Sequence, residues 1–244
     1  MSGVPAARGR EIEGAGVRAA LFDLDGLLVD SEPLWSIAEA EVMDRLGGPW
    51  NASVKAACLG RPIEVSCREL VRIAGANVDP ETVQERLLGR MVELFRTDLP
   101  WMPGARELLE SLTARGVPLA LVSSSYRVLV DAALATIGSH WFATTLAGDE
   151  VRHGKPHPEP YLTAASRLGV DPQACVVFED SPVGLAAAHA AGSFCVVVPN
   201  AVPVRADEGL MVLGALGHLD WDRLDSLYAS WVPSALRTGA NVGL

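Results

Sequence analysis

The sequence has few positive charges, few aromatic residues and few cysteines. It carries 20 lysine and arginine residues against 30 aspartate and glutamate residues, which gives a formal net charge of −10. This balance argues against non-specific binding to nucleic acid or to an anionic membrane surface. The four cysteines, Cys58, Cys67, Cys175 and Cys195, show no C-x-x-C spacing. Neither a disulfide framework nor a zinc site is therefore expected.

Long apolar runs are absent as well. No run approaches the length that spans a membrane, and residues 1–16 lack the continuous apolar core of a signal peptide. We therefore expect a flexible tail over 1–16 in a cytoplasmic protein, and a monomer as the default for an acidic domain of this kind. At 244 residues, with hydrophobic residues making up 49%, the chain is long enough for one core and an insert.

Short apolar runs alternate with helical patterns over 17–31 and 99–244. This alternation predicts βαβ units and an α/β fold, a doubly wound parallel sheet of the Rossmann-like type. The predicted strands cover 17–22, 117–122, 144–147, 174–178 and 194–198.

The segment 32–98 contains helical patterns without a strand between them. Ser31 followed by Pro33 is a typical helix start, and Asp79-Pro80 is another. Four helices in this segment predict a cap inserted into a discontinuous core.

Two aspartates directly follow the first predicted strand, in Asp23-Leu24-Asp25-Gly26. Residues two apart in an extended segment project to the same side, at the strand end where α/β folds bind ligands. Two carboxylates this close repel each other, and a divalent cation would relieve the repulsion. An aspartate-rich turn that caps the next helix is the alternative reading of these residues alone.

Other predicted strands and loops end in polar residues of complementary chemistry. They are the serines of 123–125, Lys155 in Gly154-Lys155-Pro156, and the pair Glu179-Asp180. Carboxylates, a hydroxyl group and a lysine at one edge of a sheet are the ingredients of phosphoryl transfer.

These motifs together resemble the haloacid dehalogenase superfamily. The pattern D-x-D-G-x-x-x-D-S, a strand ending in serine, G-K-P-x-P-x-P and E-D-S occur in that order, and the resemblance spans about residues 17–200. The stretch D-S-E-P-L-W, residues 30–35, is similar to the sugar-phosphate phosphatases of the superfamily.

The resemblance implies a division of roles. Asp23 would be the nucleophile that forms an aspartyl-phosphate, and Asp25 would be the general acid and then the base. The catalytic set would be completed by Ser123 and Lys155. Mg²⁺ would be held by the Asp23 carboxylate, the Asp25 backbone carbonyl and Asp180, with Glu179 as a ligand through water or as an outer-shell partner. The implied phosphate- and substrate-binding residues are Ser123, Ser124, Lys155, Trp35, Arg61 and Glu64, although Ser124 and Ser125 also fit as helix caps and Trp35 as a packing residue of the cap.

The sequence is compatible with three functions. The first is a Mg²⁺-dependent phosphatase acting on a small phosphomonoester such as a sugar or polyol phosphate. The second is a mutase of the β-phosphoglucomutase type. It is disfavoured because Trp35 stands where that enzyme has a histidine and Ile63 about where it has an arginine, although the nearby Arg61 could substitute for that arginine. The third is a non-catalytic phosphometabolite-binding protein, disfavoured because Asp23 and Asp25 are both present.

Overall fold

A single parallel sheet forms the centre of the computed structural model, which describes residues 16–200, 204 and 211–231. Within these residues the sheet has six strands in the order β3-β2-β1-β4-β5-β6, and every neighbouring pair is parallel. The strands are β1 (Ala19–Phe22), β2 (Leu119–Val122), β3 (Thr144–Leu146), β4 (Cys175–Glu179), β5 (Phe194–Val197) and β6 (Met211–Val212). Five strands were predicted. β6 was not, because its two residues offer too short a pattern to recognise.

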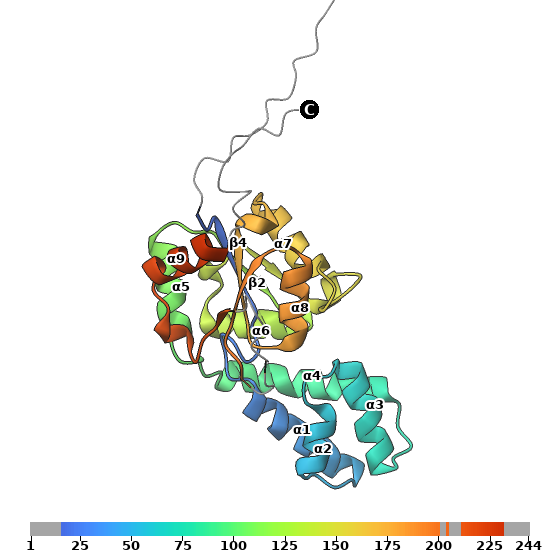
Figure 1. Ribbon diagram of the computed structural model, residues 1–244. Coiled ribbons are helices and arrows are strands. Elements are labelled where there is room, and N and C mark those ends of the chain that lie inside the picture. The colour runs from blue at the N-terminus through green and yellow to red at the C-terminus, as the bar shows by residue number, and fades with distance from the viewer. Residues whose placement is uncertain (1–15, 201–203, 205–210, 232–244) are drawn as a thin grey trace, which may run out of the picture.

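Helices cover both faces of this sheet (Figure 1). Ala20 and Phe22 of β1 share one core cluster with α5 (Ala105–Ala114), α6 (Arg127–Ile137) and α9 (Trp221–Trp231). Ala19 and Leu21 belong to a second cluster with α7 (Glu159–Leu168) and α8 (Pro182–Ala190). Because alternate residues of a strand point to opposite faces, β1 is buried on both sides. The predicted doubly wound α/β fold is confirmed.

Five helices lie between β1 and β2 along the chain, and the first four of them form a separate group. These four are α1 (Glu32–Leu46), α2 (Ala52–Cys58), α3 (Ile63–Ala74) and α4 (Pro80–Thr97), and together we call them the cap. Figure 1 shows the cap as a smaller lobe beside the sheet and its helices, with α4 packed against α6. The side chains of Asn51 and Asp79 accept backbone hydrogen bonds at the starts of α2 and α4.

The predicted start of α1 needs one correction. Ser31 precedes the helix as expected, but its hydroxyl makes no capping hydrogen bond and donates to Asp25 instead. The boundaries 17–31, 32–98 and 99–244 stay a prediction, and the predicted tail lies outside the described residues apart from Gly16. No helix in the described part of the chain is long and apolar enough to cross a membrane.

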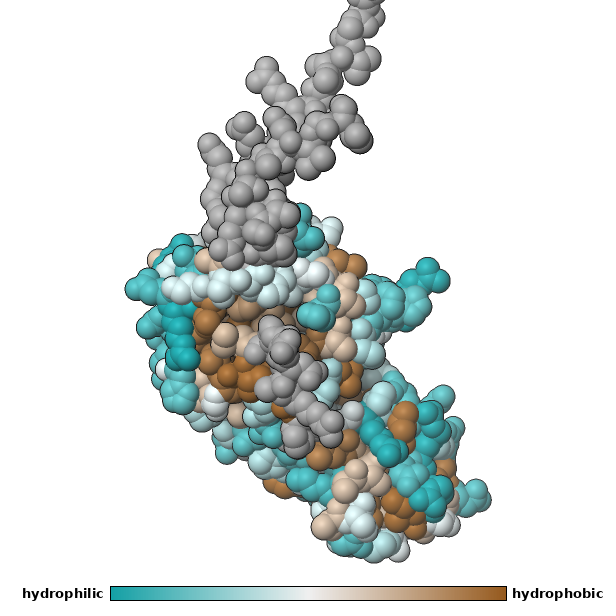
Figure 2. All heavy atoms as spheres, in the orientation of Figure 1, coloured by the Kyte–Doolittle hydropathy of each residue, from teal (hydrophilic) through white to brown (hydrophobic). Residues whose placement is uncertain are grey.

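Most charged residues lie on the outside of the molecule. Figure 2 shows hydrophilic residues along much of the outer edge of both lobes, with hydrophobic residues gathered near the middle of the larger lobe. In the described part of the chain, the buried acidic residues are Asp23, Glu39 and Glu179. A buried carboxyl group is costly unless a partner compensates it. Packing alone does not explain these three residues, and they are therefore candidates for a functional role.

Candidate active site

A cavity of about 940 Å³ lies between the carboxyl edge of the sheet and the cap. This volume accommodates a small metabolite. The cavity contains nine of the ten predicted site residues: Asp23, Asp25, Ser123, Ser124, Lys155 and Asp180 from the sheet side, and Trp35, Arg61 and Glu64 from the cap. Glu179, the tenth, lies fully buried behind the lining.

Lys155 is held against two acidic residues at the end of β1 and β4. Its Nζ donates to Asp23 Oδ1 at 2.5 Å, to Glu179 Oε1 at 2.7 Å and to the carbonyl oxygen of Val122 at 2.9 Å. Burial disfavours the ammonium, but Asp23 and Glu179 outweigh it and raise the pKa of Lys155. Lys155 is therefore a permanent positive charge beside the Asp23 carboxylate, although the two residues are 132 positions apart.

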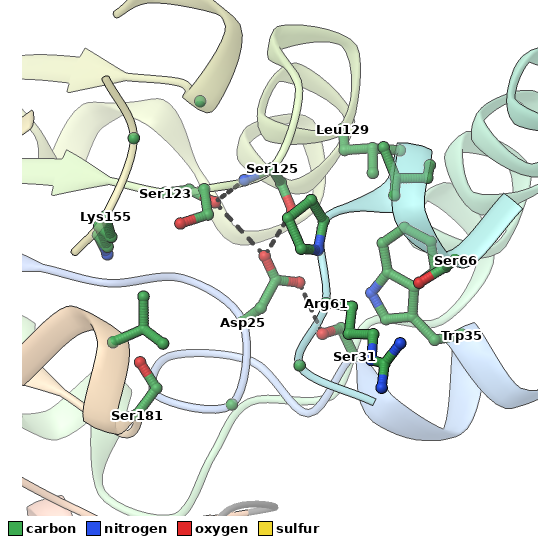
Figure 3. Close-up of a pocket in the computed structure, with 18 of the residues that line it drawn as sticks. Asp25, Ser31, Trp35, Arg61, Ser66, Ser123, Ser125, Leu129, Lys155 and Ser181 are labelled. Carbon is green, nitrogen blue, oxygen red and sulfur yellow. Dashed lines mark hydrogen bonds between the residues drawn. The ribbon is translucent and has the colours of Figure 1, made fainter. Parts of the chain in front are cut away.

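Asp25 accepts hydrogen bonds from serine hydroxyl groups on both sides (Figure 3). Ser31 Oγ donates to Oδ1 at 2.6 Å, and Ser125 Oγ donates to Oδ2 at 2.8 Å. Ser123 Oγ is 3.4 Å from Oδ2 and accepts the Ser125 backbone N–H at 2.9 Å. These contacts fix the orientation of the Asp25 carboxylate.

The serine cluster corrects part of the sequence reading. Tyr126, not a serine, occupies the position before α6, and Asp149 Oδ1 accepts the Arg127 backbone N–H at 2.8 Å. The Ser125 hydroxyl therefore donates to Asp25 and does not cap α6. Ser31 was not predicted to be a site residue, and the sequence allowed Ser125 to be either a helix cap or a ligand, because both match ordinary helix-start patterns.

Glu179 is saturated by donors of this chain. Oε1 accepts from Tyr161 Oη at 2.6 Å as well as from Lys155, and Oε2 accepts from Ser181 Oγ at 3.0 Å. The backbone N–H groups of Asp180 and Ser181 also donate to Oε2, at 3.1 and 3.3 Å. Through these hydrogen bonds, the Glu179 carboxylate fixes the positions of Lys155, Tyr161 and Ser181. The sequence alone could not distinguish Tyr161 from an ordinary core aromatic residue.

The residues present fit a divalent cation. Carboxylate oxygens of Asp23, Glu179 and Asp180 lie within 4.8 Å of one another, and Asp25 is a fourth acid against the single ammonium of Lys155. Burial raises the pKa of Asp180 to about 7 and that of Asp23 well above its ordinary value; Glu179 adds to both shifts and Lys155 opposes both. This excess of buried negative charge is what a bound cation would compensate.

The backbone leaves room for this arrangement at Gly26. Its φ of 82° favours glycine, and a Cβ atom there would overlap the Asp180 carboxylate. The turn after Asp25 and the acidic end of β4 can approach each other only because Gly26 has no side chain.

The cap contributes a different set of groups. Tyr126 Oη, from the sheet side, donates to Glu64 Oε1 and accepts from Gln84 Nε2, the latter at 3.1 Å, so it joins α3 and α4 to the larger lobe. Trp35 is partly buried against the core, so it packs within the cap, and it also lines the cavity; its contact with a substrate stays a prediction. The exposed Arg61 side chain has no hydrogen bond or ion pair with any residue the structure describes.

Comparison with known proteins places the chain in a family. The haloacid dehalogenase-like hydrolases match residues 17–192, a span that includes every predicted site residue. The chain belongs to this family. The predicted superfamily and the prediction of an enzyme are thereby confirmed.

Relatives of this hydrolase resemble it over most of their length. Validoxylamine A 7'-phosphate phosphatase of Streptomyces hygroscopicus subsp. limoneus is 40% identical over 73% of this chain and 84% of its own. Hexitol phosphatase B of Escherichia coli K12 is 33% identical over 75% of this chain and 84% of its own. The structure of CbbY from Rhodobacter sphaeroides in complex with phosphate is 27% identical, with a TM-score of 0.75 over 83% of this chain and 96% of that chain.

Proposed function

We propose that this hydrolase is a Mg²⁺-dependent phosphatase that acts on a small phosphorylated carbohydrate or polyol through an aspartyl-phosphate intermediate. The observation that carries the proposal is the pairing of Asp23 with Lys155, at 2.5 Å, in the same cavity as the hydrogen-bonded Asp25. The two named phosphatases among its relatives support the reaction class.

In the first step, an Asp23 carboxylate oxygen attacks the phosphorus atom of the substrate. The bond from phosphorus to the leaving oxygen breaks, and that oxygen takes the proton of the Asp25 carboxyl group. Lys155 holds the nucleophile in place and compensates negative charge as it develops. The serine hydroxyls around Asp25 suit this role because a hydroxyl can both donate and accept, and so can serve either protonation state.

In the second step, water attacks the phosphorus atom of the aspartyl-phosphate. Asp25, now a carboxylate, takes a proton from that water, and the bond between phosphorus and the Asp23 oxygen breaks. Inorganic phosphate leaves, and both aspartates return to their starting states.

The cation would be held by Asp23 and Asp180, together with the Asp25 backbone carbonyl, while Glu179 would keep these groups and Lys155 in place. When bound, Mg²⁺ supplies positive charge that compensates the carboxylates and the transferring phosphoryl group. The hydroxyl-bearing remainder of the substrate would contact the cap side of the cavity, at Trp35 and Arg61 (Figure 3).

Phosphorus NMR of the purified protein with Mg²⁺ and a panel of sugar and polyol phosphates tests this proposal. The panel includes β-glucose 1-phosphate. We expect inorganic phosphate to accumulate, chelation to stop it, and Asp23→Asn to slow it by about 10³-fold or more. Conversion of the 1-phosphate to the 6-phosphate without phosphate release would establish the mutase instead. Binding without turnover of any substrate would establish the non-catalytic alternative.

A further inference from the structure

One buried acidic residue of the cavity has no part in the chemistry described above. Glu39 of α1 lies one helical turn beyond Trp35 on the same face, is only 7% exposed and lines the cavity. Among the residues that the structure describes, none hydrogen bonds to its carboxyl group or forms an ion pair with it. No fully buried side-chain oxygen among these residues lacks a partner, so the carboxyl oxygens of Glu39 reach the open space of the cavity.

Neighbouring charged groups do not compensate Glu39. The charge of Lys55 lowers the pKa of Glu39, but Lys55 Nζ pairs with Glu32 Oε1 at 3.3 Å. Glu32 itself repels a Glu39 carboxylate, and burial together with this repulsion raises the pKa of Glu39 to about 7. Glu41, two residues further along α1, shows the contrast, because Arg90 donates to both of its oxygens at 2.8 and 3.0 Å.

Packing does not account for a carboxyl group at this position. A leucine or methionine would fill the same place near Cys58 at no desolvation cost, whereas a largely buried acid without a protein partner is unfavourable. The open side of Glu39 is the cavity, so the missing donors would come from a molecule bound there.

We propose that the Glu39 carboxylate binds two neighbouring hydroxyl groups of the substrate's leaving group, and this inference rests on the proposed phosphatase function. A carboxylate presents two acceptor oxygens and no donor, which matches the paired O–H donors of a vicinal diol. Lys155 and Asp25 lie on the sheet side of the cavity, and Figure 3 shows Trp35 on the opposite side of Asp25 from Lys155. Glu39, on the same helix face as Trp35, belongs to the part of the cavity that the leaving group would occupy.

The test compares substrates with and without hydroxyl groups. Sorbitol 6-phosphate carries vicinal hydroxyls, and phenyl phosphate carries none. For Glu39→Ala, the ratio of kcat/KM for the polyol phosphate to that for the phenyl ester should fall about 10- to 100-fold, mainly through KM. Glu39→Gln, which keeps one acceptor oxygen, should fall less. Asp44→Asn, an exposed carboxyl group on the same helix, is the matched control and should leave the ratio unchanged.

Binding provides a readout that does not need turnover. In the Asp23→Asn protein with Mg²⁺, adding Glu39→Ala should weaken sorbitol 6-phosphate binding about 10-fold or more in calorimetry. An unchanged substrate ratio with unchanged binding would overturn the role of Glu39 and leave the phosphatase intact. Absence of any turnover, with binding still dependent on Glu39, would overturn the proposed reaction and keep the hydroxyl-binding role.

Discussion

Replacing Glu39 with glutamine is expected to remove a pH-dependent loss of stability. Burial, with Glu32 adding and Lys55 opposing, raises the pKa of Glu39 from 4.5 to about 7 in the folded protein. The folded state then binds a proton more tightly than the unfolded state between these two values. The stability linked to this proton is fully present below pH 4.5 and is lost as the pH rises through about 7.

The size of the loss follows from the same numbers. Each pKa unit corresponds to about 1.4 kcal/mol, so the full displacement amounts to about 3 kcal/mol in the free energy of unfolding. About 2.5 kcal/mol of this falls between about pH 5 and pH 8. The other titratable side chains that face Glu39 are Cys58 and Cys67, and burial raises the pKa values of their thiols to about 11 and about 12. Neither thiol titrates in this range.

Urea unfolding of the wild type, Glu39→Gln and Asp44→Asn across this pH range measures the effect. A chelator is included because metal binding would itself depend on pH. We expect the wild type to lose about 2.5 kcal/mol relative to Glu39→Gln on going from about pH 5 to pH 8, and Asp44→Asn to parallel the wild type. A difference between the wild type and Glu39→Gln that stays constant to within about 0.5 kcal/mol would refute the reasoning.

Three further substitutions test other parts of the structure. Gly184→Ala places a Cβ atom against the Glu179 carboxylate and should lower the free energy of unfolding by about 1–3 kcal/mol, measured in urea, and also lower kcat. Tyr126→Phe removes the hydroxyl that donates to Glu64 of the cap and should raise KM for a polyol phosphate severalfold in steady-state kinetics, with kcat less affected. Phe95→Ala empties a fully buried position in α4 and should cost about 3–5 kcal/mol by chemical denaturation.

Each of these substitutions has an outcome that would contradict its rationale. Unchanged stability of Gly184→Ala would mean that Glu179 can move without cost. A purely kcat effect of Tyr126→Phe would argue against a contact that holds the cap. A small loss for Phe95→Ala, of the size seen at exposed positions, would show that α4 is not packed as described.

The parallel sheet and the position of its polar edge could be read from the sequence. Apolar runs such as 17–22 followed at once by Asp23 and Asp25 encode a buried strand and its ligand-binding end within a few residues. The positions of Lys155 and of the acidic pair at 179–180 could be predicted in the same way, because each occurs where a predicted strand or loop meets a helix. Hydrophobic periodicity and turn-forming residues are local properties, so they can be recognised from the amino-acid sequence alone.

The partners of these residues were decided by the tertiary structure alone. Ser125 lies 100 positions from the Asp25 that it contacts, and Tyr161 lies 18 positions from Glu179. Their types and local patterns also fit a helix start and a core aromatic residue, respectively. Glu39 falls in an ordinary amphipathic helix pattern. Only the packing of α1 against the other cap helices turns its carboxyl group toward the cavity, where no described residue pairs with it. Which polar groups are paired and which are left for a ligand depends on distances between segments far apart in the chain, and no local pattern records those distances.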